Sequence, residues 1–224
     1  MPRFAAPLAR AAATALLAAL PALAVAQSAA RPAASRAAAP RATAAAPLDT
    51  AVFAGGCFWG VEAVFDHVRG VQRAVSGYAG GRAASPSYED VSTGATGHAE
   101  SVQVVYDPRQ VSYAQLLDVF FTVAHDPTEL NRQGPDVGTQ YRSAVFYRTP
   151  AQKQALDAYL AGLKARGVYR KPIVTQVAPA GPFHEAESYH QGYLARHTDQ
   201  PYIVFNDLPK LDALKKRYPG LYRA

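Results

Sequence analysis

The chain has 224 residues, and its 23 lysines and arginines outnumber its 17 aspartates and glutamates, which gives a formal net charge of +6. Residues 1–48 hold five arginines and no acidic residue, so the rest of the chain has 18 basic and 17 acidic residues. A nearly neutral segment gives no electrostatic reason to expect nucleic-acid binding. Cys57 is the only cysteine, which excludes an intramolecular disulfide.

The first 48 residues contain two segments that we expect to lie outside the fold. Residues 1–26 carry two arginines and then an Ala/Leu run, and they end in small residues, which is typical of a secretory signal peptide. The apolar run is too short to predict a membrane span. Residues 27–48 are rich in Ala, Pro and Arg, which predicts a disordered linker. Residues 49–224 then form one catalytic domain, and we expect a monomer exported to the bacterial periplasm.

Cys57 lies in the stretch Ala51-Val-Phe-Ala-Gly-Gly-Cys-Phe-Trp-Gly60. The apolar residues before the two glycines predict a buried strand, the glycines a tight turn, and residues 57–68 a helix. The free N–H groups and the dipole at a helix N-terminus favour a thiolate, so the position predicts a nucleophile. An inert buried thiol is the alternative for an isolated cysteine. The two glycines before it and the two aromatic residues after it favour the functional interpretation.

The helix after Cys57 has one apolar stripe, made of Phe58, Val61, Val64, Phe65 and Val68. Trp59, the only tryptophan, falls on the other side of the helix with Glu62, Ala63 and Asp66. An indole beside a reactive thiol suits a small apolar group of a substrate. The alternative is that Trp59 only packs against the fold.

Residues 71–78 predict a second strand, and residues 82–97 a long loop that contains Tyr88. Loops of this length in compact domains are usually functional.

The strand predicted over residues 98–106 places Glu100 on the same face as Val102, Val104 and Tyr106. A carboxyl group on a core-facing side is desolvated, which raises its pKa and lets it act as a general acid. The alternative is a glutamate at the end of the strand that reaches solvent. Periodicity alone leaves both interpretations open.

Ser112 is a predicted N-cap for a helix that buries Leu116, Leu117, Phe120 and Phe121. Residues 130–141 predict a second long loop, with Asp136 and Tyr141 near its end. From their types alone, Asp136 is a turn former and Tyr141 an ordinary strand aromatic.

The remaining elements are a strand over 141–147, a helix over 149–166 with Leu156, Leu160 and Leu163 as its stripe, a strand over 173–177 and a lysine-rich outer helix over 209–218. His184 and His190 lack the His-Glu-x-x-His spacing of a metal helix, so we expect no metal site and place both on a helix surface or cap. The order of elements predicts an α+β two-layer sandwich with a ferredoxin-like βαββαβ core plus C-terminal helices.

Between about Ala51 and Tyr218 the sequence resembles the A-type peptide methionine sulfoxide reductases. Four ordered motifs carry the resemblance: Gly56-Cys-Phe-Trp-Gly60, Gly77-Tyr-Ala-Gly-Gly81, Thr96-Gly-His-Ala-Glu100 and Arg132-Gln-Gly-Pro-Asp-Val-Gly-Thr-Gln-Tyr-Arg-Ser143. The resemblance implies thiol-dependent reduction of methionine-S-sulfoxide, free and in proteins, through a sulfenic acid on Cys57, with repair of oxidised proteins as the result.

The resemblance also implies the site residues. Cys57 matches the nucleophile and Glu100 the carboxyl that protonates the sulfoxide oxygen. Further matches are Phe58 and Trp59, as the pocket for the substrate methyl group, and Tyr88, Asp136 and Tyr141, as the residues that bind and polarise the sulfoxide. No bound cofactor and no metal are implied.

One departure concerns regeneration. Many family members carry further cysteines near the C-terminus that resolve the sulfenic acid, and this chain has none. We therefore expect an external thiol reductant, a thioredoxin-like protein or a small thiol.

Two other functions fit parts of the pattern. The first is a cysteine hydrolase or acyl transferase that pairs Cys57 with a histidine such as His98, which the period of two places on the same strand face as Glu100. The second is a non-catalytic exported module that senses oxidants through Cys57 or binds oxidised partners.

Overall fold

The structure is a computed structural model, and it describes residues 47–224. The predicted signal peptide over 1–26 and all but the last two residues of the predicted linker over 27–48 lie outside the described residues. Within residues 47–224, no helix is both long and apolar enough to cross a membrane.

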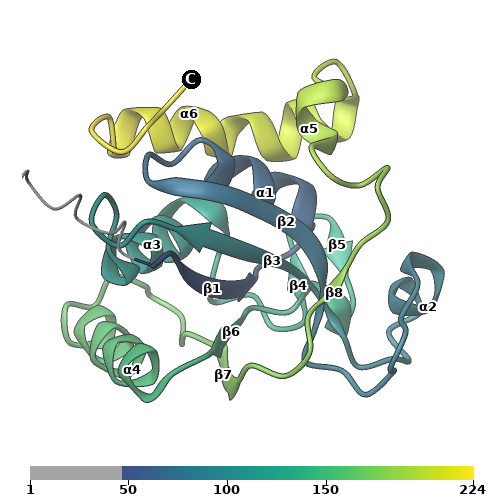
Figure 1. Cartoon of the computed structure of the whole chain (residues 1–224), viewed down its shortest axis with the longest axis horizontal. Coiled ribbons are helices and arrows are strands. Elements are labelled where there is room, and N and C mark those ends of the chain that lie inside the picture. The colour runs from purple at the N-terminus through teal and green to yellow at the C-terminus, as the bar shows by residue number, and fades with distance from the viewer. Residues whose placement is uncertain (1–46) are drawn as a thin grey trace, which may run out of the picture. The chain divides into compact units, whose positions relative to one another are not determined.

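The described chain contains both strands and helices (Figure 1). The strands are β1 (Asp49–Ala54), β2 (Val71–Ala79), β3 (Ala99–Tyr106), β4 (Arg132–Gln133), β5 (Asp136–Val137), β6 (Ala144–Tyr147), β7 (Gln176–Pro179) and β8 (His184–Glu185). The α-helices are α1 (Phe58–Asp66), α2 (Tyr88–Ser92), α3 (Tyr113–Val119), α4 (Pro150–Ala165), α5 (Tyr193–Arg196) and α6 (Leu208–Arg217). Two π-helical turns, η1 (Phe120–Ala124) and η3 (Ile203–Asp207), and the 3₁₀ turn η2 (Thr139–Tyr141) complete the order.

The larger sheet has the strand order β7-β6-β1-β3-β2-β8. Its four central strands, β6-β1-β3-β2, are antiparallel to one another, and α1 and α3 connect them as in a ferredoxin-like βαββαβ unit. β7 extends the sheet parallel to β6, and β8 extends it antiparallel to β2. The predicted α+β fold class with this core is therefore confirmed.

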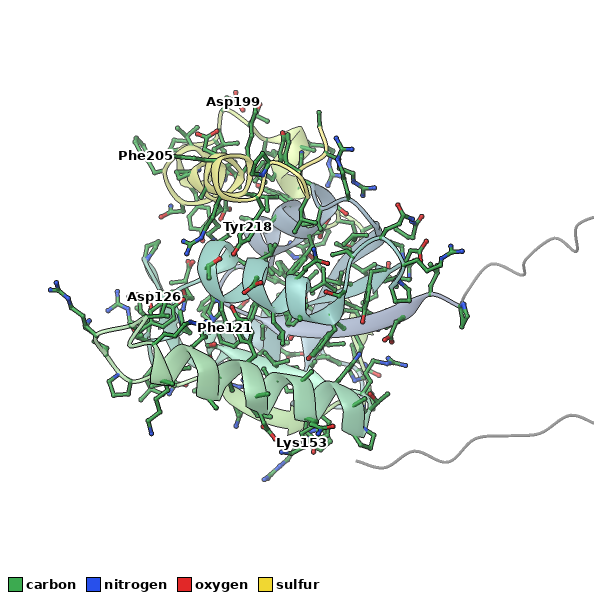
Figure 2. The ribbon with its side chains drawn as sticks, turned by 90° about the vertical axis from the view of Figure 1, so that its left-hand side faces the viewer. Phe121, Asp126, Lys153, Asp199, Phe205 and Tyr218 are labelled. Atoms are coloured by element: carbon green, nitrogen blue, oxygen red, sulfur yellow. The ribbon has the colours of Figure 1, made fainter. Side chains whose placement is uncertain are left out.

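The two faces of the sheet are unequal. Alternation along β1 places Ala51 and Phe53 in the main core, which the helices cover, and Val52 and Ala54 in a smaller cluster on the opposite face. α6 lies over α1 on the helical side of the sheet (Figure 1). Figure 2 shows α4 and η3 at opposite sides of the molecule, with Phe205 of η3 pointing outward into solvent.

The predicted first helix is observed with its whole apolar stripe buried. Ser112 caps α3 as predicted, through a capping box in which its hydroxyl accepts a hydrogen bond from the backbone N–H of Gln115. The helix predicted over 149–166 is α4, with Thr149 as its N-cap.

The loops contain more structure than the sequence predicted. The loop over 82–97 includes α2, because Ser87 and Asp90 form a capping box that nucleates one turn. The loop over 130–141 folds back on itself as the β4–β5 hairpin. Tyr141 ends the turn η2, so the interpretation of Tyr141 as a strand aromatic is wrong, and the strand begins only at Ala144.

The C-terminal third differs most from expectation. The strand predicted over 173–177 is displaced to 176–179. The segment that contains His184 and His190 is not a helix, because His184 pairs with Tyr78 on the sheet edge and the following residues form turns. His190 is 2% exposed, so the prediction of a surface position is wrong.

Candidate active site

Neighbouring side chains approach the backbone before Cys57 so closely that they leave room only for the two glycines. Gly56 has a φ of +88°, a conformation that favours glycine. A Cβ at Gly56 would lie 2.5 Å from the Cβ of Gln133 in the β4–β5 hairpin, and one at Gly55 would lie 2.9 Å from the Cγ of His125. The turn after β1 is therefore packed tightly between these side chains, and it delivers Cys57 to the N-cap position of α1.

The thiol of Cys57 lies in a largely dry environment, with the residue 8% exposed. Burial raises the pKa of Cys57 well above 9.0, and the negative charges of Glu100 and Asp207 raise it further. The backbone N–H of Trp59 and the ammonium group of Lys210 lower it, but not enough to reverse the effect. The expectation that the helix N-terminus alone would favour a thiolate is therefore wrong, because desolvation outweighs the dipole.

Glu100 points into the site as the strand periodicity predicted, and it is 2% exposed. Its Oε2 accepts a hydrogen bond of 3.0 Å from the backbone N–H of Phe58, the residue after Cys57. Burial raises the pKa of Glu100 to about 8, and the nearby carboxylates of Asp136 and Asp207 also raise it. The hydrogen bond from Phe58 lowers this pKa, but by less than burial raises it. At neutral pH the group is a carboxylic acid, which can donate a proton beside Cys57.

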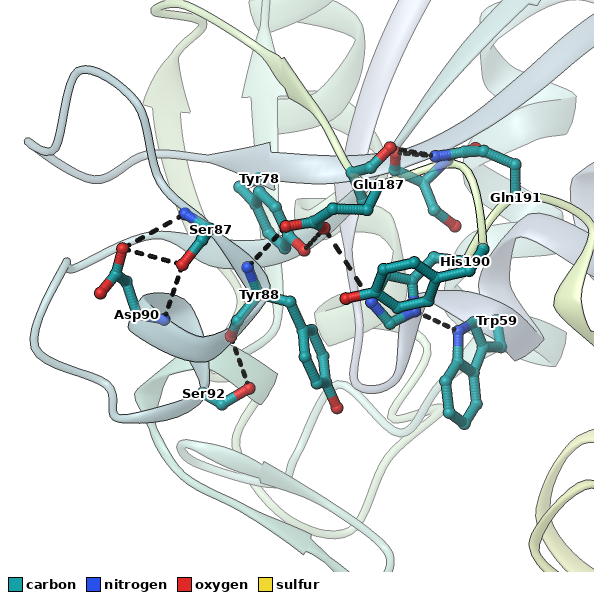
Figure 3. Close-up of polar contacts among 12 residues, drawn as sticks. Trp59, Tyr78, Ser87, Tyr88, Asp90, Ser92, Glu187, His190 and Gln191 are labelled. Carbon is teal, nitrogen blue, oxygen red and sulfur yellow. Dashed lines mark hydrogen bonds and ion pairs between the residues drawn. The ribbon is translucent and has the colours of Figure 1, made fainter.

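Trp59 is half-buried and held by two residues from the C-terminal segment, of which Figure 3 shows His190. Its Nε1–H donates a hydrogen bond of 3.0 Å to Nδ1 of His190, and its ring stacks on Tyr193 with a centroid distance of 3.8 Å and an interplanar angle of 9°. Burial lowers the pKa of His190, which keeps the imidazole neutral and Nδ1 free to accept. Phe58 is buried, with its ring centroid 5.0 Å from that of His190.

A second network positions Tyr88 at the edge of the site (Figure 3). Glu187 accepts a hydrogen bond of 2.9 Å from the backbone N–H of Tyr88 and one of 2.8 Å from the hydroxyl group of Tyr78. The Tyr88 ring lies 4.4 Å from His190 by centroids. Burial raises the pKa of Tyr88, as do the charges of Glu100 and Cys57, so its phenol remains a proton donor within electrostatic range of both.

Asp136 and Tyr141 approach the same site from the second long loop. Burial raises the pKa of Tyr141, and the negative charges of Glu100, Asp136 and Cys57 raise it further. Asp136 is half-buried and accepts a hydrogen bond from the hydroxyl group of Tyr202. The structure thus brings the six other predicted site residues into one cluster around Cys57.

His98 is not part of this cluster. Its Nδ1 accepts a hydrogen bond from the backbone N–H of Gly81, and its Nε2 lies 2.9 Å from the carbonyl oxygen of Ala83. Both ring nitrogens are therefore occupied, and the ring contributes to a hollow with Phe146 and Ala178. The prediction that His98 shares the face of Glu100 is wrong, because His98 precedes β3 and the alternation begins only at Ala99.

The residues that sequence reasoning missed all come from the C-terminal segment. They are Glu187, His190, Tyr193, Tyr202, Asp207 and Lys210. The density of tyrosine and histidine between 188 and 202 was the available signal, but this stretch has no helical or strand periodicity that would have placed it.

A buried thiol, a protonated carboxyl, two phenols and an aromatic wall define a cysteine-dependent oxidoreductase site. The family profile described as "Peptide methionine sulfoxide reductase" matches residues 49–220. This chain belongs to that family. It reduces methionine sulfoxide, and it is a peptide-methionine (S)-S-oxide reductase of the A type.

Individual proteins agree with the family profile. Peptide methionine sulfoxide reductase MsrA 2 from Mesorhizobium japonicum is 55% identical over 174 residues, which cover 78% of this chain and 89% of that protein. The reduced form of Mxr1 from Saccharomyces cerevisiae superposes with a TM-score of 0.62 at 34% identity, over 69% of this chain and 88% of the yeast chain. Methionine sulfoxide reductase A of Corynebacterium diphtheriae superposes with a TM-score of 0.58 at 39% identity, over 67% of this chain and 76% of that chain.

Proposed function

We propose that Cys57 is the nucleophile and Glu100 the proton donor of the reduction. The observation that carries this proposal is the hydrogen bond from the backbone N–H of Phe58 to Glu100. Since Phe58 follows Cys57 directly, this bond holds a neutral carboxyl group beside Cys57. The sulfur of Cys57 attacks the sulfoxide sulfur, and the sulfoxide oxygen takes a proton from Glu100. The products are methionine and a sulfenic acid on Cys57, so the sulfoxide is reduced and the cysteine oxidised by two electrons.

The other site residues bind the sulfoxide. The half-buried indole of Trp59, fixed by His190 and Tyr193, and the ring of Phe58 form the apolar wall for the S-methyl group. Tyr88 and Tyr141 keep their phenolic protons, so both can donate hydrogen bonds to the oxygen as negative charge develops on it.

Asp136 completes this set at the entrance to the site. Its bond to Tyr202 ties the β4–β5 hairpin to the segment before η3, which encloses the substrate between two loops.

An external thiol regenerates the enzyme in this proposal. The support is the count of one cysteine, since no second thiol of the chain can capture the sulfenic acid. One external thiol displaces water to give a mixed disulfide, and a second thiol, which a dithiol such as a thioredoxin-like protein supplies itself, releases the Cys57 thiol. Mxr1 from Saccharomyces cerevisiae has been crystallised in complex with Trx2.

The site of action is proposed from residues 1–48 alone. We infer that the signal peptide directs export to the bacterial periplasm, that the linker tethers a monomeric domain, and that oxidised exported proteins and free methionine sulfoxide are the substrates. Intact mass of the protein recovered from a periplasmic extract tests this, with cleavage after Ala26 as the expected result.

A single-turnover reaction tests the chemistry. Reduced enzyme is mixed with methionine-S-sulfoxide in the absence of reductant. The reaction is quenched with a dimedone reagent that labels sulfenic acids, and the mass of the intact protein is measured by mass spectrometry. About one label per chain on Cys57 and one methionine per enzyme are expected. Cys57→Ser is the matched control and should release no methionine. Methionine release without a labelled or thiol-capped Cys57 would show that the oxidising equivalent is held elsewhere.

A further inference from the structure

Two charged side chains from the C-terminal segment lie against the first turn of the helix that follows Cys57. Asp207 is fully buried, and its Oδ1 lies 3.0 Å from Nζ of Lys210. A Cβ at Gly60 would lie 2.0 Å from Oδ1 of Asp207 and 2.9 Å from Nζ of Lys210. The pair therefore fills the space that any side chain at position 60 would need, within one helical turn of Cys57.

The pair is not fully satisfied by its own contacts. Oδ2 of Asp207 is buried and has no hydrogen-bond partner among residues 47–224. Burial raises the pKa of Asp207 and Lys210 lowers it. A buried carboxyl with one free oxygen costs stability that an apolar contact at the same place would avoid. An apolar contact would hold this segment against α1 without that cost, so packing alone does not account for the pair.

The ionisable groups that face Cys57 come from every element around it. Glu100 lies on β3, and Asp207 and Lys210 lie at the junction of η3 and α6. The phenols that share this environment are Tyr88, Tyr141 and Tyr202. Among the groups named here, Lys210 is the cation that lowers the pKa of Cys57, and it also lowers the pKa of Asp136 and of His125.

We propose that Lys210, held by Asp207 against the first turn of α1, is a positioning residue that supplies the positive charge against which the Cys57 thiolate forms. This inference rests on the proposed attack by Cys57. Asp207 fixes the ammonium group at the helix, and the pair together sets how readily the thiol gives up its proton.

The test is a pH titration of the thiolate in the folded, substrate-free protein. The rate at which iodoacetamide alkylates Cys57 is followed from pH 6 to 11, because only the thiolate reacts and the tyrosines give no signal. Lys210→Gln keeps a hydrogen-bond donor for Asp207 but removes the charge. We expect its titration to move up by about one pH unit, which is about a tenfold lower thiolate fraction at a fixed pH below the pKa. The shift should be visible throughout this alkaline range, because the carboxyl groups near Cys57 stay ionised in it.

For the other variants we expect either a shift of the titration in the opposite direction or no shift. Asp207→Asn leaves the Lys210 cation without its counter-charge, so the titration should move to lower pH. Lys210→Arg should follow the parent protein, and so should Lys216→Gln, which removes a charge from an exposed position of the same helix.

Shifts of the same sign in Lys210→Gln and Asp207→Asn, or curves that coincide with the parent, would overturn the inference and leave a structural tie. If Lys210→Gln does not fold, the double variant Asp207→Asn/Lys210→Gln is compared with Asp207→Asn alone: a titration at higher pH in the double variant supports the inference, and coinciding curves refute it. The titration needs no turnover. A failure of the proposed function would therefore appear separately, as absent sulfenic acid in the single-turnover experiment.

Discussion

Glu100 should make the protein less stable as the pH rises, and Glu100→Gln should remove that effect. The folded pKa of Glu100 is about 8, against 4.5 for an unperturbed glutamate. Between these values the folded state keeps a proton that the unfolded state has lost, so the free energy of unfolding falls as pH rises from 4.5 to about 8. The penalty is about 3 kcal/mol at pH 7 and about 5 kcal/mol above pH 8, from the difference in pKa.

The glutamine variant has no such titration but keeps a carbonyl oxygen for the Phe58 N–H. Urea unfolding followed by circular dichroism, repeated from pH 5 to pH 9, should show Glu100→Gln more stable than the parent by a few kcal/mol at pH 8–9. The gap should narrow steadily as the pH falls and nearly vanish at pH 4.5–5. Glu185→Gln, which changes an exposed carboxyl on β8, is the control and should give no such trend. A gap that is independent of pH, or one that grows as the pH falls, would refute the assignment of a buried, protonated Glu100.

Three further predictions concern activity. Glu100→Gln should slow methionine release in a single turnover by ~10²–10⁴ at neutral pH, since the amide donates no acid proton, and near-normal release would contradict the role. Trp59→Ala should raise the Michaelis constant far more than it lowers the thermal midpoint, because the indole is half-buried; a collapsed midpoint with an unchanged Michaelis constant would show that it is a core residue. His98→Ala should keep most of the activity, because both ring nitrogens bond to backbone groups near Gly81, whereas a loss as complete as that of Glu100→Gln would favour a cysteine–histidine hydrolase.

The parts of the site that lie on regular elements could be predicted from the sequence. Glu100 sits in a strand whose alternation is unbroken, so its direction follows from a period of two. Trp59 follows from the period of α1 in the same way. The core-facing direction of Glu100 is observed. Trp59 does leave the apolar stripe, but its side of α1 is covered by the C-terminal segment, so that Glu62 and Ala63 are buried and Trp59 packs against the core.

The site residues that lie on loops could not be predicted from periodicity. Asp136 and Tyr141 read as a turn former and a strand aromatic, and only the family resemblance pointed to the site. Tyr202, Asp207 and Lys210 were missed altogether, because they enter through a segment folded against α1 by tertiary contacts. The ionisation of Cys57 was also misjudged, since a helix N-terminus can be read from the sequence but the depth of burial that opposes it cannot.

Burial makes Cys57 and Glu100 a pair that shares one proton during the reaction. At neutral pH both are protonated, since the pKa of Cys57 is well above 9.0 and that of Glu100 is about 8. The productive form is a thiolate on Cys57 beside a protonated Glu100, and the two groups then hold one proton between them. The form with a thiol beside an ionised Glu100 also holds one proton, and it is the main form between the two pKa values. The productive fraction therefore rises up to about pH 8 and then stays level until the thiol itself titrates. A dry site thus lowers the population of thiolate. In return it keeps Glu100 protonated at the pH where the sulfoxide oxygen takes up a proton and is left on Cys57 as the hydroxyl group of the sulfenic acid.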